Sequence, residues 1–161
     1  MQITLLCVSK PVRGWAEAAC QEYEKRLRGM LNFAVKEIPP IALSKNQSKN
    51  GLSQNKDKEA QALLNATPKQ STMFALDENG THFRTREFAD RLEALKLEGR
   101  DITFYIGGAD GLGERILNQC QQRIALSKMT MPHLIARIVF TEQLYRVASL
   151  LNNHPYHRDG S

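Results

Sequence analysis

The chain has 161 residues, a mass of 18.2 kDa and a formal net charge of +5, with 42% hydrophobic and 24% charged residues. These values are typical of a single globular domain over residues 1–161 and exclude a disordered, fibrous or disulfide-rich class. No apolar run approaches the ~20 residues that a membrane-spanning helix needs, and residues 1–10 lack the basic start and cleavage site of a signal peptide.

The cysteines and the basic charge bear on the cellular compartment and on nucleic-acid binding. Cys7, Cys20 and Cys120 are odd in number and widely spaced, which predicts reduced thiols in a cytoplasmic protein. The isoelectric point of about 9.2 permits nucleic-acid binding without demonstrating it, because many moderately basic proteins bind none.

The first segments of the chain alternate between strand and helix patterns. Residues 3–8 and 33–38 are predicted strands, and two prolines end the second. Between them, hydrophobic side chains recur at i, i+4 spacing and predict a helix that packs by this face and stops at Gly29. These side chains are Trp15, Ala19, Tyr23 and Leu27.

A polar stretch, residues 44–58, is predicted to be a surface loop that runs into a helix near Asp57. Its lysines are candidates for contacts with phosphates, but a solvated loop is slightly favoured because no aromatic residue or arginine accompanies them to stack on bases. The lysines are Lys45, Lys49, Lys56 and Lys58.

The middle of the chain continues the alternation. Residues 71–76 predict a third strand, and residues 77–80, Asp-Glu-Asn-Gly, predict its turn. Hydrophobic residues at helical spacing follow, and Gly99 marks the end of that helix. The sequence therefore predicts an α/β fold, with a mainly parallel sheet covered by helices on both faces.

Two strand ends after residue 101 open into unusual loops. Residues 102–106 predict a buried strand followed by a glycine-rich loop, and a helix is expected over residues 114–122. A short strand over residues 124–126 then leads into residues 127–133. Ligands of open α/β sheets bind at the carboxyl ends of strands, where both loops would lie.

Neither common phosphate-binding motif fits the glycine-rich loop. The dinucleotide fingerprint has no match, and a P-loop starting at Gly108 would need lysine and then serine or threonine where Glu114 and Arg115 stand. Asp110 and Glu114 would also place negative charge at the start of the helix. A neutral or cationic ligand is therefore expected near this loop, although a simple tight turn also explains the glycines.

The last predicted helix, residues 134–151, is apolar nearly all round. Such a helix is buried, and in a small domain a second subunit is a natural cover for it. Glu142 and Arg146 stand at i, i+4, which favours an internal ion pair over a catalytic role.

Three separated segments, taken together, resemble one family. They are residues 105–112 (YIGGADGL), 126–133 (LSKMTMPH) and 153–158 (NHPYHR). In this order they are similar to the SPOUT-class 23S ribosomal RNA pseudouridine-N3 methyltransferases, the family of ribosomal RNA large subunit methyltransferase H. The resemblance implies a C-terminal trefoil knot, which sequence rules alone would not predict. It also implies S-adenosyl-L-methionine as cofactor and a homodimer that acts on 23S ribosomal RNA in the large subunit or the assembled ribosome.

The resemblance also implies which residues hold the cofactor. They follow three strands: Leu76 after the third, Gly108 after the fourth, and a run of six after the fifth. The six are Ser127, Lys128, Met129, Thr130, Met131 and Pro132. Glycine at position 108 permits close approach of a ligand to the backbone, and leucine and methionine offer apolar surface.

Methylation of N3 requires removal of the proton that this ring nitrogen carries. The candidate catalytic residues are His133, Tyr156, His157 and Arg158, with His154 as a further possible base. His154 and His157 stand at i, i+3 spacing, but no further metal-ligating side chain lies at suitable spacing, so no metal is expected.

Two other functions fit the same residues. One is a related SPOUT methyltransferase that modifies the ribose of transfer RNA, and the other is a non-catalytic RNA-binding module without a cofactor. Binding of S-adenosylmethionine distinguishes the module from both enzymes, and the identity of the methylated nucleoside distinguishes the two enzymes.

Overall fold

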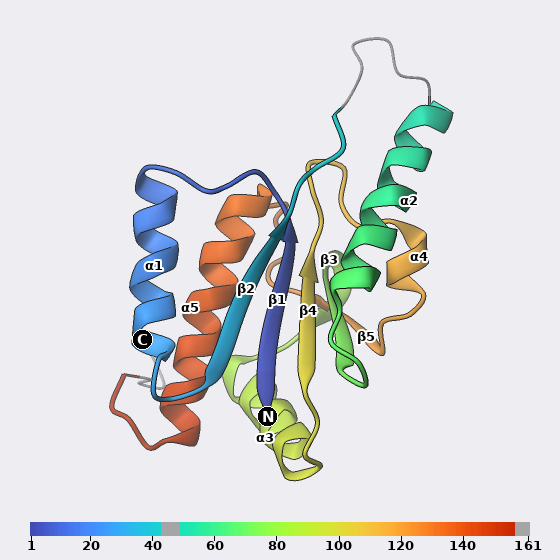
Figure 1. Cartoon of the computed structure of the whole chain (residues 1–161). Coiled ribbons are helices and arrows are strands. Elements are labelled where there is room, and N and C mark those ends of the chain that lie inside the picture. The colour runs from blue at the N-terminus through green and yellow to red at the C-terminus, as the bar shows by residue number, and fades with distance from the viewer. Residues whose placement is uncertain (43–48, 157–161) are drawn as a thin grey trace.

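Five strands form one sheet in the order β2-β1-β4-β3-β5, and every neighbouring pair is parallel (Figure 1). The computed structural model describes residues 1–42 and 49–156, and the side chains of all of these except 49 and 50. The strands are β1 Gln2–Val8, β2 Asn32–Ile38, β3 Thr72–His82, β4 Ile102–Ile106 and β5 Gln122–Ala125. The predicted mainly parallel sheet is confirmed.

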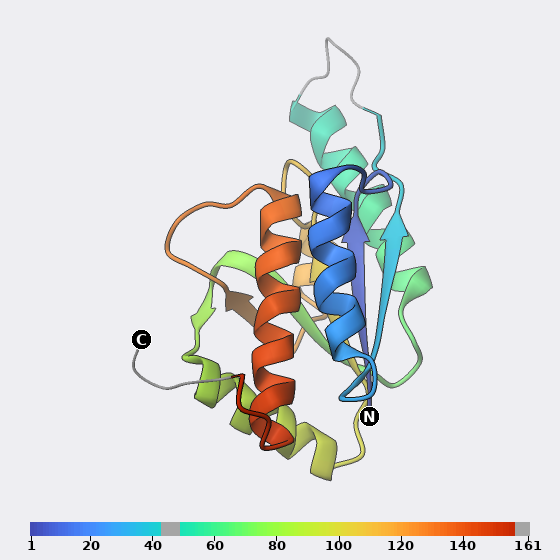
Figure 2. The same cartoon turned by 90° about the vertical axis from the view of Figure 1, so that its left-hand side faces the viewer.

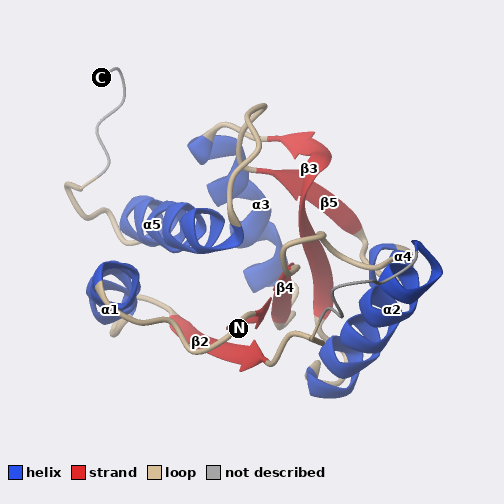
Figure 3. Cartoon of the chain, turned by 90° about the horizontal axis from the view of Figure 1, so that it is seen from above, coloured by secondary structure: helices blue, strands red, loops and turns tan. Residues whose placement is uncertain are grey.

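Helices cover both faces of this sheet, also as predicted (Figure 3). They are α1 Trp15–Leu27, α2 Lys49–Ala66, α3 Thr85–Leu97, α4 Glu114–Leu117 and α5 His133–Leu151. Alternate strand residues build two cores, because successive side chains of a strand point to opposite faces. Phe104 of β4 packs with α1, α3 and α5, whereas the next residue, Tyr105, packs with α2 and α4.

The register of the strands brings their carboxyl ends to one edge of the sheet, at the top of Figure 1. Cys7 of β1 pairs with Ile106 of β4, and Leu76 of β3 pairs with Ile124 of β5. The trefoil knot stays a prediction, because strand order and pairing do not define how the chain is threaded.

Strand β3 is interrupted where the sequence predicts a turn. Leu76 and Thr81 both pair with Ile124, so residues 77–80 bulge out between them. A Cβ atom on Gly80 would lie 2.6 Å from backbone atoms of Arg123 and Ile124. Glycine is therefore required for the bulge to return onto β5.

The predicted face of α1 is wrong at its first residue. The buried residues of α1 are Ala16, Cys20 and Leu27, whereas the Trp15 side chain is 68% exposed. The buried stripe begins one position after the predicted one, at Ala16, because the side of α1 that packs against α5 and β2 starts there. The large indole ring stays outside the core.

Two predicted helix boundaries are also wrong. Helix α2 already includes residue 49, well before the predicted start near Asp57. Helix α4 is a single turn that ends at Leu117, because the chain then joins the sheet: the Gln121 amide donates to the carbonyl oxygen of Met73 at 2.9 Å, and β5 begins at Gln122. The part of the predicted loop over residues 43–48, including Lys45, lies outside the described residues.

The three cysteines are free. Burial raises the pKa of the Cys7 and Cys120 thiols to about 12, so both are protonated at neutral pH. Neither thiol is therefore expected to act as a nucleophile.

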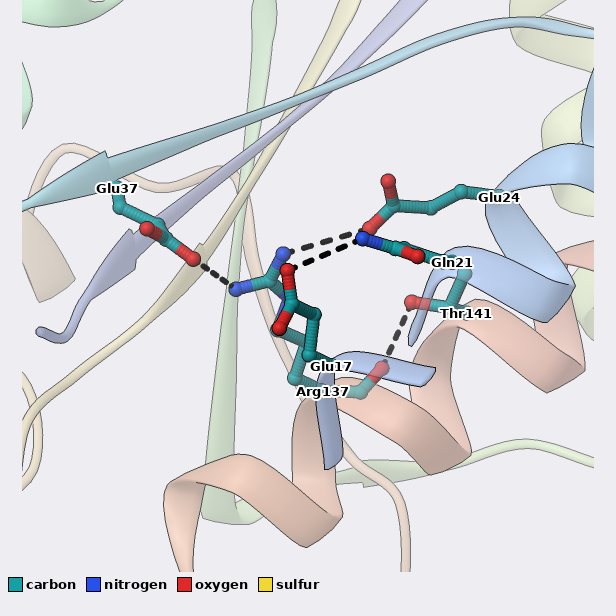
Figure 4. A network of polar contacts seen from close by, with 6 residues as sticks. All are labelled: Glu17, Gln21, Glu24, Glu37, Arg137 and Thr141. Carbon is teal, nitrogen blue, oxygen red and sulfur yellow. Dashed lines mark hydrogen bonds and ion pairs between the residues drawn. The ribbon is translucent and has the colours of Figure 1, made fainter. Parts of the chain in front are cut away.

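A buried arginine ties α5 to α1 and β2 (Figure 4). The Arg137 side chain is only 9% exposed, and its guanidinium donates to Glu37 at 2.5 Å and to Glu24 at 3.3 Å. Thr141 donates to the carbonyl oxygen of Arg137 at 2.8 Å. The two carboxylates compensate the guanidinium charge, so the position of α5 depends on this cluster.

We predict that Arg137→Ala lowers the free energy of unfolding by about 3 kcal/mol or more, because two partly buried carboxylates lose their counter-ion. Urea denaturation followed by circular dichroism measures this change. The matched control is Arg100→Ala. This arginine pairs with Glu98 at 3.6 Å, and both side chains are more than half exposed. The midpoint of urea denaturation of this variant should therefore hardly change. Equal effects of the two substitutions would contradict the structural role of Arg137.

Candidate active site

Three loops converge at the carboxyl edge of the sheet and enclose a cavity of about 770 Å³. They follow β3, β4 and β5, whose ends lie side by side in Figures 1 and 3. This volume lies within the range of about 300–1,000 Å³ that is usual for sites of small organic ligands. Both strand ends that the sequence analysis singled out therefore open into one cavity.

The loop after β4 depends on a glycine at position 107. A Cβ atom there would lie 2.6 Å from the carbonyl oxygen of Gly111 and from the amide nitrogen of Leu112. The loop folds back tightly, and the Gly111 amide donates to the carbonyl oxygen of Gly108 at 3.1 Å. Gly108 lines the cavity, but a Cβ atom there would meet only side-chain atoms, the nearest being a Val8 methyl group at 3.3 Å. The strictest requirement for glycine therefore falls on Gly107.

The loop after β5 is shaped by its own side chains and joined to the loop after β3. The Met129 amide donates to the Ser127 hydroxyl at 2.9 Å. The Thr130 hydroxyl donates to the Glu78 carboxylate at 2.9 Å, and both of these residues line the cavity. This bond holds two cavity walls together, and no local sequence pattern predicts the pairing.

The structure brings most of the predicted cofactor residues together. Those that line the cavity are Leu76, Gly108, Ser127, Met129, Thr130, Met131 and Pro132. Lys128 is exposed and does not contribute to the lining. Residues that are more than fifty positions apart thus meet because β3 and β5 are neighbours in the sheet.

The lining combines apolar and acidic side chains. Its large aliphatic members are Leu76, Ile106, Leu112, Leu117, Ile124 and Leu126, and its carboxylates are Asp77, Glu78, Asp110 and Glu114. The Arg123 guanidinium lies 3.9 Å from the Glu114 carboxylate and compensates part of this charge. Aliphatic and acidic groups together suit a ligand that has both an apolar ring and a positive charge. The neutral or cationic ligand expected near this loop stays a prediction.

Lys56 of α2 also lines the cavity, although the sequence indicated a solvated loop lysine. Helix α2 is held there by close packing, since a Cβ atom on Gly113 would lie 2.7 Å from the carbonyl oxygen of Lys56. In the sequence, the glycine at position 113 indicates that another element packs closely there, but it does not identify this element as α2.

The predicted catalytic residues do not all meet at the cavity. His133 is the first residue of α5, is partly buried and lines the cavity. Tyr156 instead donates to Glu142 at 3.2 Å. Glu142 follows His133 by more than two helical turns, roughly 14 Å along the axis at 1.5 Å per residue. Within one chain, the tail therefore starts far from the cavity.

Tyr156 is held by three contacts with α5. The centre of its ring lies 4.4 Å from the centre of the Tyr145 ring and 5.1 Å from the guanidinium carbon of Arg146. Arg146 also pairs with Glu142 at 2.6 Å, which confirms the predicted ion pair. Burial, with the nearby Glu142 carboxylate, raises the pKa of Tyr156 to about 12. Tyr156 is therefore a hydrogen-bond donor at neutral pH and not a base.

The remaining tail candidates lie elsewhere or outside the described part. His154 is exposed, its amide donates to the carbonyl oxygen of Ser149 at 2.8 Å, and its ring lies 6.4 Å from that of Tyr145. His157 and Arg158 lie outside the described residues.

Within residues 1–42 and 49–156, no group of three or more histidines, cysteines or carboxylates is placed to hold a metal ion. No helix in the same ranges is long and apolar enough to cross a membrane.

Comparisons with known proteins identify the family and support the fold. A family model described as "Predicted SPOUT methyltransferase" matches residues 1–157. Among solved structures, a probable methylase family protein from Haemophilus influenzae has a similar fold, with a TM-score of 0.52 and 13% identity over 99% of this chain and 71% of that chain.

Relatives named "Ribosomal RNA large subunit methyltransferase H" are similar over nearly the full length. The relative from Dechloromonas aromatica is 39% identical over 160 residues, which cover 99% of this chain and 100% of that protein. The relative from Neisseria meningitidis serogroup C is 38% identical over 159 residues, with the same coverage. The chain therefore belongs to the SPOUT methyltransferases, in the family of ribosomal RNA large subunit methyltransferase H.

Proposed function

We propose that the protein transfers a methyl group from S-adenosylmethionine to N3 of a pseudouridine in 23S ribosomal RNA, in the cytoplasm. The observation that carries this proposal is the convergence of three loops, two of which contain the family motifs, on one cavity at the carboxyl edge of the sheet. The relatives are named for the ribosomal RNA of the large subunit. The choice of nucleoside and ring atom rests on the resemblance of the motifs.

The cavity lining fits S-adenosylmethionine by its chemistry. The groups that would hold it are Leu76, Gly108 and, after β5, Ser127, Met129, Thr130, Met131 and Pro132, and the aliphatic side chains suit the adenine ring. The carboxylates Asp77, Glu78 and Asp110 favour the positive charges of its ammonium and sulfonium groups. When bound, the cofactor supplies an electrophilic methyl group.

The protein's own part in the reaction is to position the groups and move a proton. Holding the two reactants in line supplies a large part of the rate enhancement. His133 lines the cavity, and an unprotonated imidazole can accept the N3 proton. Tyr156 lies away from the cavity of its own chain, so Tyr156 and the tail beyond it would orient the target nucleobase from the partner subunit.

We also propose that the protein is a homodimer that pairs through the outward face of α5. Ile135, Ile138 and Val139 are partly buried and lie outside both core clusters. Their spacing puts them on one stripe with Glu142 and Arg146, opposite the buried side of the helix. Tyr156 rests on this stripe. We infer that a tail beginning at this face would reach the partner's cavity rather than its own.

The function is tested by incubating the protein and radiolabelled S-adenosylmethionine with ribosomes that lack the modification. We expect label in 23S ribosomal RNA, and mass spectrometry should identify the product as 3-methylpseudouridine. Label in the ribose of transfer RNA would instead identify the related methyltransferase. No transfer to any RNA, together with no cofactor binding, would leave a non-catalytic RNA-binding module.

The cofactor site is tested by Gly107→Ala. We expect binding of S-adenosylmethionine to weaken more than about tenfold, because the new Cβ atom would overlap the backbone at Gly111 and Leu112 and open the loop. Titration calorimetry measures this, with circular dichroism to show that the sheet is retained. Lys128→Ala is the control, since this side chain lies outside the cavity lining. An unchanged affinity in Gly107→Ala would exclude this loop from the site.

The tail is tested with two defective subunits that are expressed together. Deletion of residues 154–161 should leave cofactor binding intact but lower methyl transfer by about 10². If the tail enters the partner's cavity, mixing this deletion with Gly107→Ala should restore activity, because one of the two sites then has both an intact cavity and a tail. Ile138→Glu in both subunits should abolish this rescue by breaking the dimer. No rescue by mixed dimers would mean that each tail serves its own subunit.

A further inference from the structure

Large apolar side chains are exposed at the same edge of the sheet as the cavity. Trp15, Ile41 and Met129 follow the carboxyl ends of β1, β2 and β5, and Trp15 and Met129 are 68% and 78% exposed. Exposed apolar side chains that gather near a cavity are typical of a binding surface. By contrast, Leu97, also highly exposed, ends α3 at the opposite side of the fold (Figure 1).

Trp15 begins α1 at the edge of the sheet that also carries the cavity. Helices α1 and α5 lie side by side and begin at the same edge (Figures 1 and 2). The first residue of α5, His133, lines the cavity, and Trp15 is the first residue of α1. Helices α1 and α5 pack against each other, so Trp15 and His133 begin two neighbouring helices. The β1 end also touches the cavity wall, since Val8 contacts the Gly108 position.

Two cations stand in the connection that leads to this ring. Lys10 and Arg13 are exposed, and within the described part of the chain neither forms a hydrogen bond or an ion pair. Gly14, with φ of +69°, then turns the chain into α1. Its left-handed conformation favours glycine and starts the helix with the ring outside the core.

We propose that Trp15, Lys10 and Arg13 form a contact for single-stranded RNA beside the cavity. The indole ring stacks on a nucleobase of the same RNA that is methylated, and the two cations bind backbone phosphates. The proposal rests on the proposed function, since it concerns the same RNA substrate. The helical spacing of Trp15 predicts a core position, so the sequence pattern alone does not indicate this surface.

Charge favours RNA over a second copy of the chain as the occupant. The centres of protein interfaces are depleted in lysine, and two copies meeting at this surface would bring four cations together. The net charge of +5 has the sign that attracts a polyanion. The apolar stripe on α5, with Ile135, Ile138 and Val139, is the better surface for a second copy.

Trp15 is the only tryptophan, so its fluorescence reports on this surface alone. We expect titration of the intact protein with a ten-nucleotide single-stranded RNA to quench its emission. In methyl transfer to unmodified ribosomes, Trp15→Ala should raise KM about tenfold or more, while the affinity for S-adenosylmethionine stays unchanged. Trp15→Phe should restore most of the loss, because a phenyl ring also stacks. Leu97→Ala is the matched control for loss of an exposed apolar side chain and should keep the wild-type KM.

The cations are tested by the salt dependence of RNA binding. Lys10→Ala and Arg13→Ala should each lower the slope of log affinity against log salt by about 0.7, the value for one phosphate contact with a single strand. A wild-type KM in Trp15→Ala would overturn the proposal. Acrylamide quenching of the Trp15 emission is a second test. If acrylamide quenches Trp15 only after the dimer dissociates, a second copy of the chain covers the ring, and the proposal is wrong. Failure of the methyltransferase function is distinguishable, because quenching by the RNA oligonucleotide requires neither cofactor nor methyl transfer.

Discussion

Parallel pairing of all five strands places the ends of β3, β4 and β5 on one edge of the sheet, and every part of the candidate site depends on this alignment. Connections in a parallel sheet must cross from one edge to the other, so the loops that leave the carboxyl ends are free of pairing and gather together. The order β4-β3-β5 makes β3 the central strand of the three. Leu76 is therefore flanked by the glycine-rich loop and by the loop that leads into α5.

Within this frame the cavity is closed by short-range contacts that local patterns do not specify. Gly107 lets the chain return onto Gly111, and Gly80 lets the bulge in β3 return onto β5. The bond from Thr130 to Glu78 then joins two walls across a sequence separation of about fifty residues. Each contact limits the freedom of a loop that would otherwise be mobile. A preformed cavity loses less conformational entropy when it binds its ligand.

Helix α5 connects the site to the rest of the molecule. Its first residue lines the cavity, its buried Arg137 is fixed by Glu24 and Glu37, and its outward stripe carries the apolar residues that we assign to the dimer. Tyr156 returns to this stripe through Glu142 and Arg146. One rigid element therefore relates the cavity, the proposed subunit interface and the start of the tail. A shift of α5 would change all three together.

The sequence by itself determined the α/β class, the parallel sheet and the strand Ile102–Ile106, because apolar periodicity and glycine or proline breaks act locally. It also identified most of the cavity residues, through motifs that stand directly after strands. Only the tertiary structure decided that Trp15 is exposed, that α4 is one turn long and that Tyr156 lies away from the cavity. These features depend on which surfaces meet: a side chain at helical spacing is buried only if another element covers it, and contacts such as that of Gly107 with Gly111 arise only once the loop has closed.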